Sequence, residues 1–104
     1  MTTVKRQTTI YPDIRSFRHK GLKALYDDGT TRYVAAAHVE KLRDILGLLD
    51  LARTPSDLNL PGFGLHPLKG RASGAWAARV SGNWRLGFRF LGQDVVAVDY
   101  LDYH

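Results

Sequence analysis

The clearest pattern in the first half of the chain is a stripe of apolar residues at helical spacing. Between Ala35 and Ala52 the stripe consists of Val39, Leu42, Leu46 and Leu49. Most charged residues of this stretch lie off the stripe. A period near 3.6 with one apolar face is typical of a helix that packs on a core. The pattern therefore predicts a helix over Ala35–Ala52.

Two shorter helices and a short strand flank this one in the sequence. His19–Asp27 is predicted to be helical, because apolar residues recur at i, i+3 and i+4 from Leu22, and Gly29 is expected to end it. Thr54–Asp57 combines a cap residue, a proline and an acid, which predicts one short helical turn. Ile14–Phe17 is expected to form a short strand.

The second half of the chain changes to the patterning of strands. Aromatic and branched residues predict strands over Ala75–Val80, Trp84–Phe90 and Val95–Tyr100, separated by short turns. A further strand is expected around Phe63–Leu68. Helices in one block followed by strands in another indicate an α+β fold, with the N-terminal helices packed on one face of a C-terminal antiparallel β-sheet.

Alternation along these strands separates a core face from an outer face. The core face is expected to carry Trp76, Ala78, Val80, Trp84, Leu86, Phe88 and Phe90. The outer face would then carry small residues and arginines, namely Ala75, Ala77, Arg79, Arg85, Gly87 and Arg89.

The hairpin between two of these strands brings like charges together. A three-residue turn over Ser81–Asn83 would pair Val80 with Trp84 and place Arg79 opposite Arg85. Like charges in that position cost up to about 1 kcal/mol. Guanidinium groups bind phosphate with two parallel hydrogen bonds, so an arginine pair in an open depression predicts a phosphate site. The alternative is that both arginines are ordinary solvated surface residues.

Composition narrows the class of protein. The 104 residues suit one domain, and 15 Lys and Arg against 10 Asp and Glu give a net charge of +5. Asn59–Gly92 contains five basic residues and no acid, which favours an anionic partner. The chain has no cysteine, no apolar run long enough to cross a bilayer and no signal-like start, so a cytoplasmic protein is expected.

Candidate chemistry rests on a few histidines and basic residues. The four histidines are not spaced as metal ligands, and the chain has no cysteine that could complete a metal site. It also has no phosphate-binding glycine loop and no nucleophile elbow. No metal or cofactor is therefore expected. His66 and Lys69 come just before the strands of the arginine face; His66 could equally be a core residue. The tail ends in His104, whose imidazole and terminal carboxylate would suit proton transfer if the tail docks near the arginines.

Five strings of the sequence carry a resemblance to a known family. They are Ile14–Leu22, Leu58–Gly62, Leu65–Gly70, Gly82–Phe90 and Val98–His104. The likeness runs from Ile14 to His104, and the Asn-Trp-Arg and terminal Asp-Tyr-His elements together make it specific. These strings are similar to the plasmid-maintenance killer proteins, the HigB branch of the RelE toxin superfamily.

The resemblance implies a fold, an activity and partners. Members resemble compact α+β microbial ribonucleases and cut messenger RNA in the ribosomal A site, without a metal. The implied partner is a HigA-like helix-turn-helix antitoxin, through which the toxin would reach operator DNA. Met1–Asp13 precedes the usual start of the family and is expected to be a flexible extension, with the toxin domain spanning residues 14–104.

The resemblance also implies site residues. Matching motif positions are His66, Lys69, Arg85, Asp102, Tyr103 and His104. His104, Arg85, Lys69 and His66 are expected to act in catalysis, with the choice of acid and base between the histidines left open. RNA contacts are expected from Asp102 and Tyr103, and Arg79 and Arg89 are added from the strand face. Two alternatives remain: a non-catalytic RNA-binding module, and a subunit that acts only in an antitoxin complex.

Overall fold

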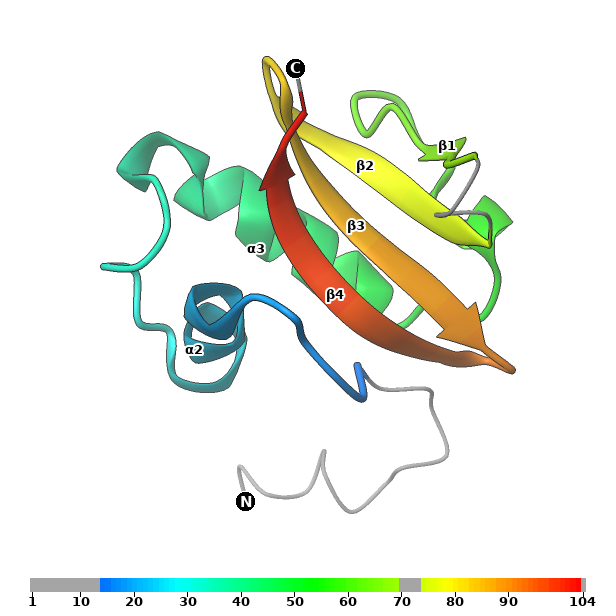
Figure 1. Cartoon of the computed structure of the whole chain (residues 1–104), viewed down its shortest axis with the longest axis horizontal. Helices are drawn as coiled ribbons and strands as arrows, with labels where there is room; N and C mark the ends of the chain where they lie inside the picture. Colours follow the sequence, from blue (N-terminus) through cyan, green and yellow to red (C-terminus); the bar gives the residue numbers. More distant parts are fainter. Residues whose placement is uncertain (1–13, 70–73, 104) are drawn as a thin grey trace.

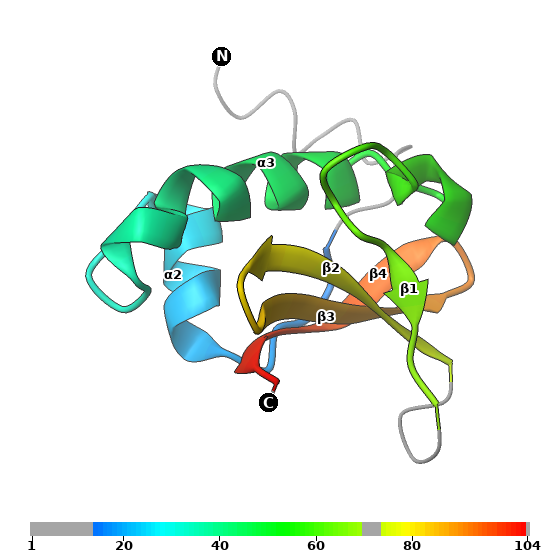
Figure 2. The same cartoon turned by 90° about the horizontal axis from the view of Figure 1, so that it is seen from above.

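The structure, a computed structural model, describes residues 14–69 and 74–103, so the expected extension Met1–Asp13 and the terminal His104 lie outside the described residues. A helical layer covers one face of a four-stranded antiparallel sheet in the order β1-β2-β3-β4 (Figures 1 and 2). The α+β architecture is as predicted. The elements are α2 (Lys20–Asp28), η1 (Ala36–His38), α3 (Val39–Leu49), η2 (Pro55–Leu58), β1 (His66–Pro67), β2 (Ala75–Ser81), β3 (Trp84–Leu91) and β4 (Asp94–Asp102).

Helix α2 is fixed at both ends by features of its own sequence. His19 lies just before the helix, and its Nδ1 accepts a hydrogen bond from the N–H of Leu22 at 3.0 Å. Gly29 ends the helix with φ at 74°, which a glycine adopts without steric cost. The predicted end was therefore correct, whereas His19 caps the helix instead of belonging to it.

Helix α3 is shorter than the pattern predicted. A 3-10 turn, Ala36–His38, precedes it, and the regular helix ends at Leu49. The buried residues of the helix are Leu42, Leu46 and Leu49 from the apolar stripe and Ile45 beside it. None of the helices in the described part of the chain is long and apolar enough to cross a membrane. The single turn η2 does begin at Thr54 with the predicted capping box.

The sheet departs from the prediction in its first strand and in the hairpin between its two middle strands. The first strand shrinks from Phe63–Leu68 to two residues, because Gly64 takes a φ of 55° and breaks the extended run before it. In the β2–β3 hairpin Ser81, not Val80, pairs with Trp84, so the expected three-residue turn is wrong. A bulge between Arg79 and Ser81 absorbs the difference.

The segment before α2 lies along the free edge of β4. Ile14 and Phe17 form isolated parallel bridges with Val95 and Val98, so the expected first strand is present only as two bridges. The pairing of β4 with β3 slips at the same place, between the partners of Gly87 and Arg89. This edge contact brings the N-terminal segment to the strand that carries the chain's C-terminal residues.

Candidate functional site on the outer face of the sheet

The face of the sheet turned away from α3 carries the arginines and small residues that alternation predicted. Cross-strand partners share a face, so the register builds this surface in rows. One row contains Arg79, Arg85 and Leu101, and the next contains His66, Ala77, Gly87 and Asp99. The two rows lie two residues apart along each strand, about 7 Å.

Arg79 and Arg85 face each other across β2 and β3, as predicted. The Nη1 atom of Arg85 donates hydrogen bonds to the carbonyl oxygens of Gly82 at 2.6 Å and Trp84 at 3.1 Å. Arg79 lies on the other side, against Gly64, where an added Cβ would stand 3.5 Å from its guanidinium carbon. The two guanidinium groups are therefore held toward opposite sides of one row. A phosphate group could bind between them.

His66 adds an imidazole to this face from β1. Its Nδ1 lies 3.0 Å from the carbonyl oxygen of Gly64. A carbonyl can only accept, so Nδ1 carries the proton and Nε2 of the neutral ring is left as an acceptor. His66 is partly exposed and is therefore not enclosed in the core. The core alternative for His66 is therefore wrong.

The C-terminal segment is docked beside the arginine pair. Strand β4 continues to Asp102, which pairs with Trp84, and the N–H of Tyr103 donates to the carbonyl of Asn83 at 2.8 Å. By this register Asp102 shares the face of Trp84 rather than that of Arg85, and its side chain is exposed. Lys69 is also exposed, and Tyr103 is half-buried. The predicted site residue His104 falls outside the described residues.

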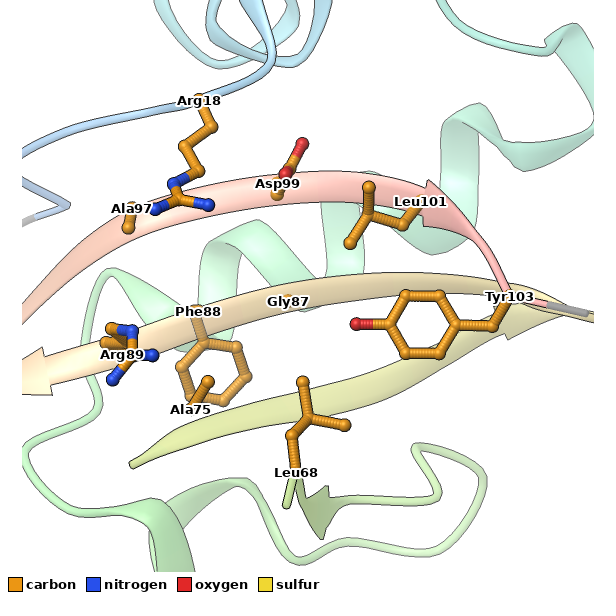
Figure 3. Close-up of a pocket in the computed structure, with 10 residues that line it drawn as sticks. All are labelled: Arg18, Leu68, Ala75, Gly87, Phe88, Arg89, Ala97, Asp99, Leu101 and Tyr103. Carbon is orange, nitrogen blue, oxygen red and sulfur yellow. The ribbon is translucent and has the colours of Figure 1, made fainter. Parts of the chain in front are cut away.

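A depression of about 300 Å³ opens beside the arginine row (Figure 3). The prediction placed Arg79 and Arg85 in such a hollow, but neither lines it. Its arginines are Arg18 and Arg89 instead, and its lining otherwise consists of Leu68, Ala75, Gly87, Phe88, Ala97, Asp99, Leu101 and Tyr103. Arg18 comes from the segment beside β4, and Arg89 from β3.

Two charged residues of this lining, Arg18 and Asp99, were not among the predicted site residues. The basic run before α2 was a sequence signal for Arg18, but nothing in the pattern placed that run beside β4. Asp99 stands in the register row of His66 and could have been found from the alternation of β4. No group of three or more His, Asp or Glu side chains within residues 14–69 and 74–103 could hold a metal ion.

The comparisons with known proteins agree with this architecture. Residues 15–104 match the family described as RelE-like toxin of type II toxin-antitoxin system HigB. The chain belongs to this family of HigB-like toxins. It is 43% identical over 91 residues to "Endoribonuclease HigB" of Proteus vulgaris, an alignment that covers 88% of this chain and 99% of that protein. Membership of a type II toxin–antitoxin family implies an antitoxin partner.

A solved structure supports the fold of this HigB-like chain independently. The YoeB/ParE toxin from Agrobacterium tumefaciens superposes with a TM-score of 0.54 at 22% sequence identity, over 88% of this chain and 98% of that one. At this identity the likeness concerns the fold alone. It agrees with the predicted RelE-like arrangement of helices on an antiparallel sheet.

Proposed function

We propose that this HigB-like toxin is an endoribonuclease that cuts messenger RNA in the ribosomal A site. The observation that carries the proposal is the position of His66, which pairs with Ala77 on the sheet face that holds Arg79 and Arg85 and whose Nδ1 is held by the carbonyl of Gly64. A base and two phosphate-binding cations on one face are what metal-free RNA cleavage requires. The curated relative named an endoribonuclease supports the same activity.

The proposed reaction is an attack of the ribose 2′-hydroxyl on the adjacent phosphorus. Nε2 of His66 takes the 2′ proton, the new 2′ O–P bond forms, and the 5′ O–P bond breaks. Arg85, with Arg79 and Lys69, stabilises the negative charge of the phosphorane. The leaving 5′ oxygen needs a proton, and His104 is the proposed donor. The products are a 2′,3′-cyclic phosphate and a 5′-hydroxyl end.

The remaining predicted residues would bind the RNA rather than react with it. The half-buried ring of Tyr103 offers a flat surface on which an unpaired base can stack. Arg89 adds positive charge at the edge of the depression, and Asp102 lies exposed next to Tyr103 and can orient the terminal residues. None of these roles needs a cofactor.

The proposed partners follow from the same surface. The ribosome would hold the mRNA in the reactive orientation and so lower the activation free energy. The few side chains of the toxin site cannot provide this positioning alone. The proposed antitoxin is a HigA-like helix-turn-helix protein, through which the toxin would contact operator DNA. The proposed place of action is the cytoplasm, where translating ribosomes are found.

Primer extension on a defined mRNA, with and without programmed 70S ribosomes, tests the proposal. The wild-type chain should cut within A-site codons only when ribosomes are present. Arg85→Ala should lower the rate by about 10²- to 10³-fold, the usual loss for one charge-stabilising group. His66→Ala should lower it by about 10²- to 10⁴-fold, the usual loss for a general base.

Two further variants distinguish the loss of a catalytic group from a non-specific effect of mutation. Arg43→Ala, on the exposed side of α3, removes one positive charge far from the site and should leave cleavage unchanged. Deleting His104 should slow cleavage if it is the acid, and unchanged cleavage would assign the acid to another group. RNA binding without cleavage by the wild-type chain on ribosomes would refute the enzyme and support the non-catalytic RNA-binding module.

A further inference from the structure

We propose that the depression between Arg18 and Tyr103 is a binding site for one unpaired RNA base that carries an exocyclic amino group. This inference rests on the proposed function for the choice of RNA as the ligand. In this proposal the hollow, which lies beside the reacting groups, binds and distinguishes a base next to the cleaved bond. Arg18 and Asp99 become RNA-binding residues, a role that the motifs of the chain do not give them.

The depression has the size and floor of a site for a small flat group. Its volume of about 300 Å³ is at the lower end of the range for small-molecule sites, roughly 300 to 1,000 Å³. The floor consists of residues with minimal side chains, among them Ala75, Gly87 and Ala97. A Cβ added to Gly87 would meet only the carbonyl oxygen of Trp76, at 3.8 Å, so the space above Gly87 is unfilled.

Asp99 gives the depression a hydrogen-bond acceptor. One carboxylate oxygen, Oδ1, accepts the N–H of Tyr100 at 2.9 Å, which fixes the side chain. Within residues 14–69 and 74–103 Asp99 has no further hydrogen bond or ion pair, so its Oδ2 is left without a partner at the lining of the hollow. A half-buried carboxylate oxygen is best satisfied by an N–H donor, and the exocyclic amino groups of cytosine, adenine and guanine supply one.

Two cations and an aromatic ring complete the recognition chemistry. Arg18 reaches over β4 beside Ala97, and Arg89 extends from β3 on the other side of the hollow (Figure 3). The backbone of Arg18 is anchored to the carbonyl of Val98 at 2.8 Å. At the far end the Tyr103 ring lies with its hydroxyl turned toward the middle (Figure 3). Cations for the neighbouring phosphates and a ring for stacking are the usual means of holding single-stranded RNA.

Uracil is the base that this chemistry disfavours. It has no exocyclic amino group, and its one N–H donor on the pairing edge, N3–H, lies between two carbonyl oxygens that would approach the carboxylate of Asp99 with like polarity. The site therefore predicts a preference among bases rather than general affinity for RNA. That preference separates it from the basic rim, which binds phosphate without regard to sequence.

The first test is NMR titration of the full chain with AMP, CMP, GMP and UMP separately. We expect amide shifts of Gly87, Ala97 and Leu101 with the three amino-bearing nucleotides, and about tenfold weaker binding of UMP. Asp99→Asn preserves the shape of the side chain but replaces one oxygen by an N–H donor, so it should abolish the preference. Asp44→Asn, an exposed site on α3, is the matched control. Equal binding of all four nucleotides, or shifts elsewhere on the fold, would overturn the site.

The second test asks whether the site acts on RNA as well as on free nucleotides. A set of ribosome-bound messages is compared in which each base next to the cleaved bond is varied in turn. At the one position that the depression binds, uracil should slow cleavage about tenfold relative to the other three bases. Asp99→Asn and Gly87→Ala, which fills the floor without removing charge, should each erase that difference. A preference seen with nucleotides but absent from cleavage would also overturn the proposal. If the wild-type chain cuts no RNA at all, the proposed function fails, while the titration still decides whether the base site exists.

Discussion

The hydroxyl oxygen of Ser16 accepts a hydrogen bond from the backbone N–H of Ala97, at 2.8 Å. Ala97 has a φ of 55°, and it is the one described residue other than glycine with a positive φ. It lies where the pairing of β3 with β4 slips by one residue. Ser16 thus holds a bulge in β4, from a segment that is 81 residues away in the sequence. The same segment carries Arg18 to the rim of the depression.

Replacing Ala97 by glycine should stabilise the fold. A side chain at positive φ costs roughly 1 kcal/mol, which glycine avoids, although glycine also gains freedom in the unfolded chain. We therefore expect the free energy of unfolding to rise by up to about 1 kcal/mol, measured by urea denaturation. Ser16→Ala removes the partner of the Ala97 N–H and should lower it by about 1 kcal/mol. Destabilisation by Ala97→Gly would show that the bulge is not strained.

The ring of Tyr103, rather than its hydroxyl, should matter for RNA cleavage. Tyr103→Phe keeps the flat surface beside the depression and should retain most of the activity. Tyr103→Ala removes it and should lower kcat/KM by about tenfold or more, since stacking on one aromatic ring contributes roughly 1–3 kcal/mol per base. Cleavage of programmed ribosomes by the two variants gives the comparison. A loss in Tyr103→Phe as large as in Tyr103→Ala would mean that the hydroxyl itself takes part.

The arginine row was predictable because it depends on local rules. Alternation assigned Arg79 and Arg85 to the outer face, and a short hairpin turn set them opposite each other. The turn itself was mistaken by one residue, yet the bulge between Arg79 and Ser81 restored the same pairing beyond it. An error in the turn therefore left the predicted pairing of Arg79 with Arg85 unchanged.

The depression was not predictable in the same way. Its rim joins Arg18 to Asp99, residues far apart in the sequence, through a parallel edge contact that no periodicity encodes. The bulge that shapes it lies at Ala97, where glycine would have been the usual sequence signal. Contacts between residues far apart in the sequence, and a bulge that no glycine indicates, thus determine where the hollow opens. Only the structure reveals them.

Acid should weaken the turn η2 through Asp57. Hydrogen bonds from the backbone N–H groups of Arg53 and Thr54 hold the pKa of the Asp57 carboxyl below its ordinary value of 3.8. Because the folded-state pKa is lowered, the stabilisation is complete above the unfolded pKa and is lost as the pH falls through the folded one. Asp57→Asn should lower the melting temperature at neutral pH and have less effect below pH 3. Equal differences at both pH values would contradict this role.

A buried polar cluster offers the sharpest test of what stabilises the core. The Tyr100 hydroxyl is paired with Nδ1 of buried His38 at 2.6 Å and accepts the N–H of Ala35 at 3.3 Å, while its ring lies 4.6 Å from that of Trp84. Tyr100→Phe keeps the ring contact but leaves the buried imidazole of His38 without its partner, which costs about 1–3 kcal/mol.

The measurement for Tyr100→Phe is urea denaturation, with Tyr33→Phe as the control. Tyr33 is 59% exposed, so losing its hydroxyl should change stability by less than about 0.5 kcal/mol. If His38 is replaced together with Tyr100, as in His38→Leu with Tyr100→Phe, part of the loss should be recovered, because the unsatisfied imidazole is gone. Additive losses in the double variant would show that His38 and Tyr100 stabilise the core independently of each other.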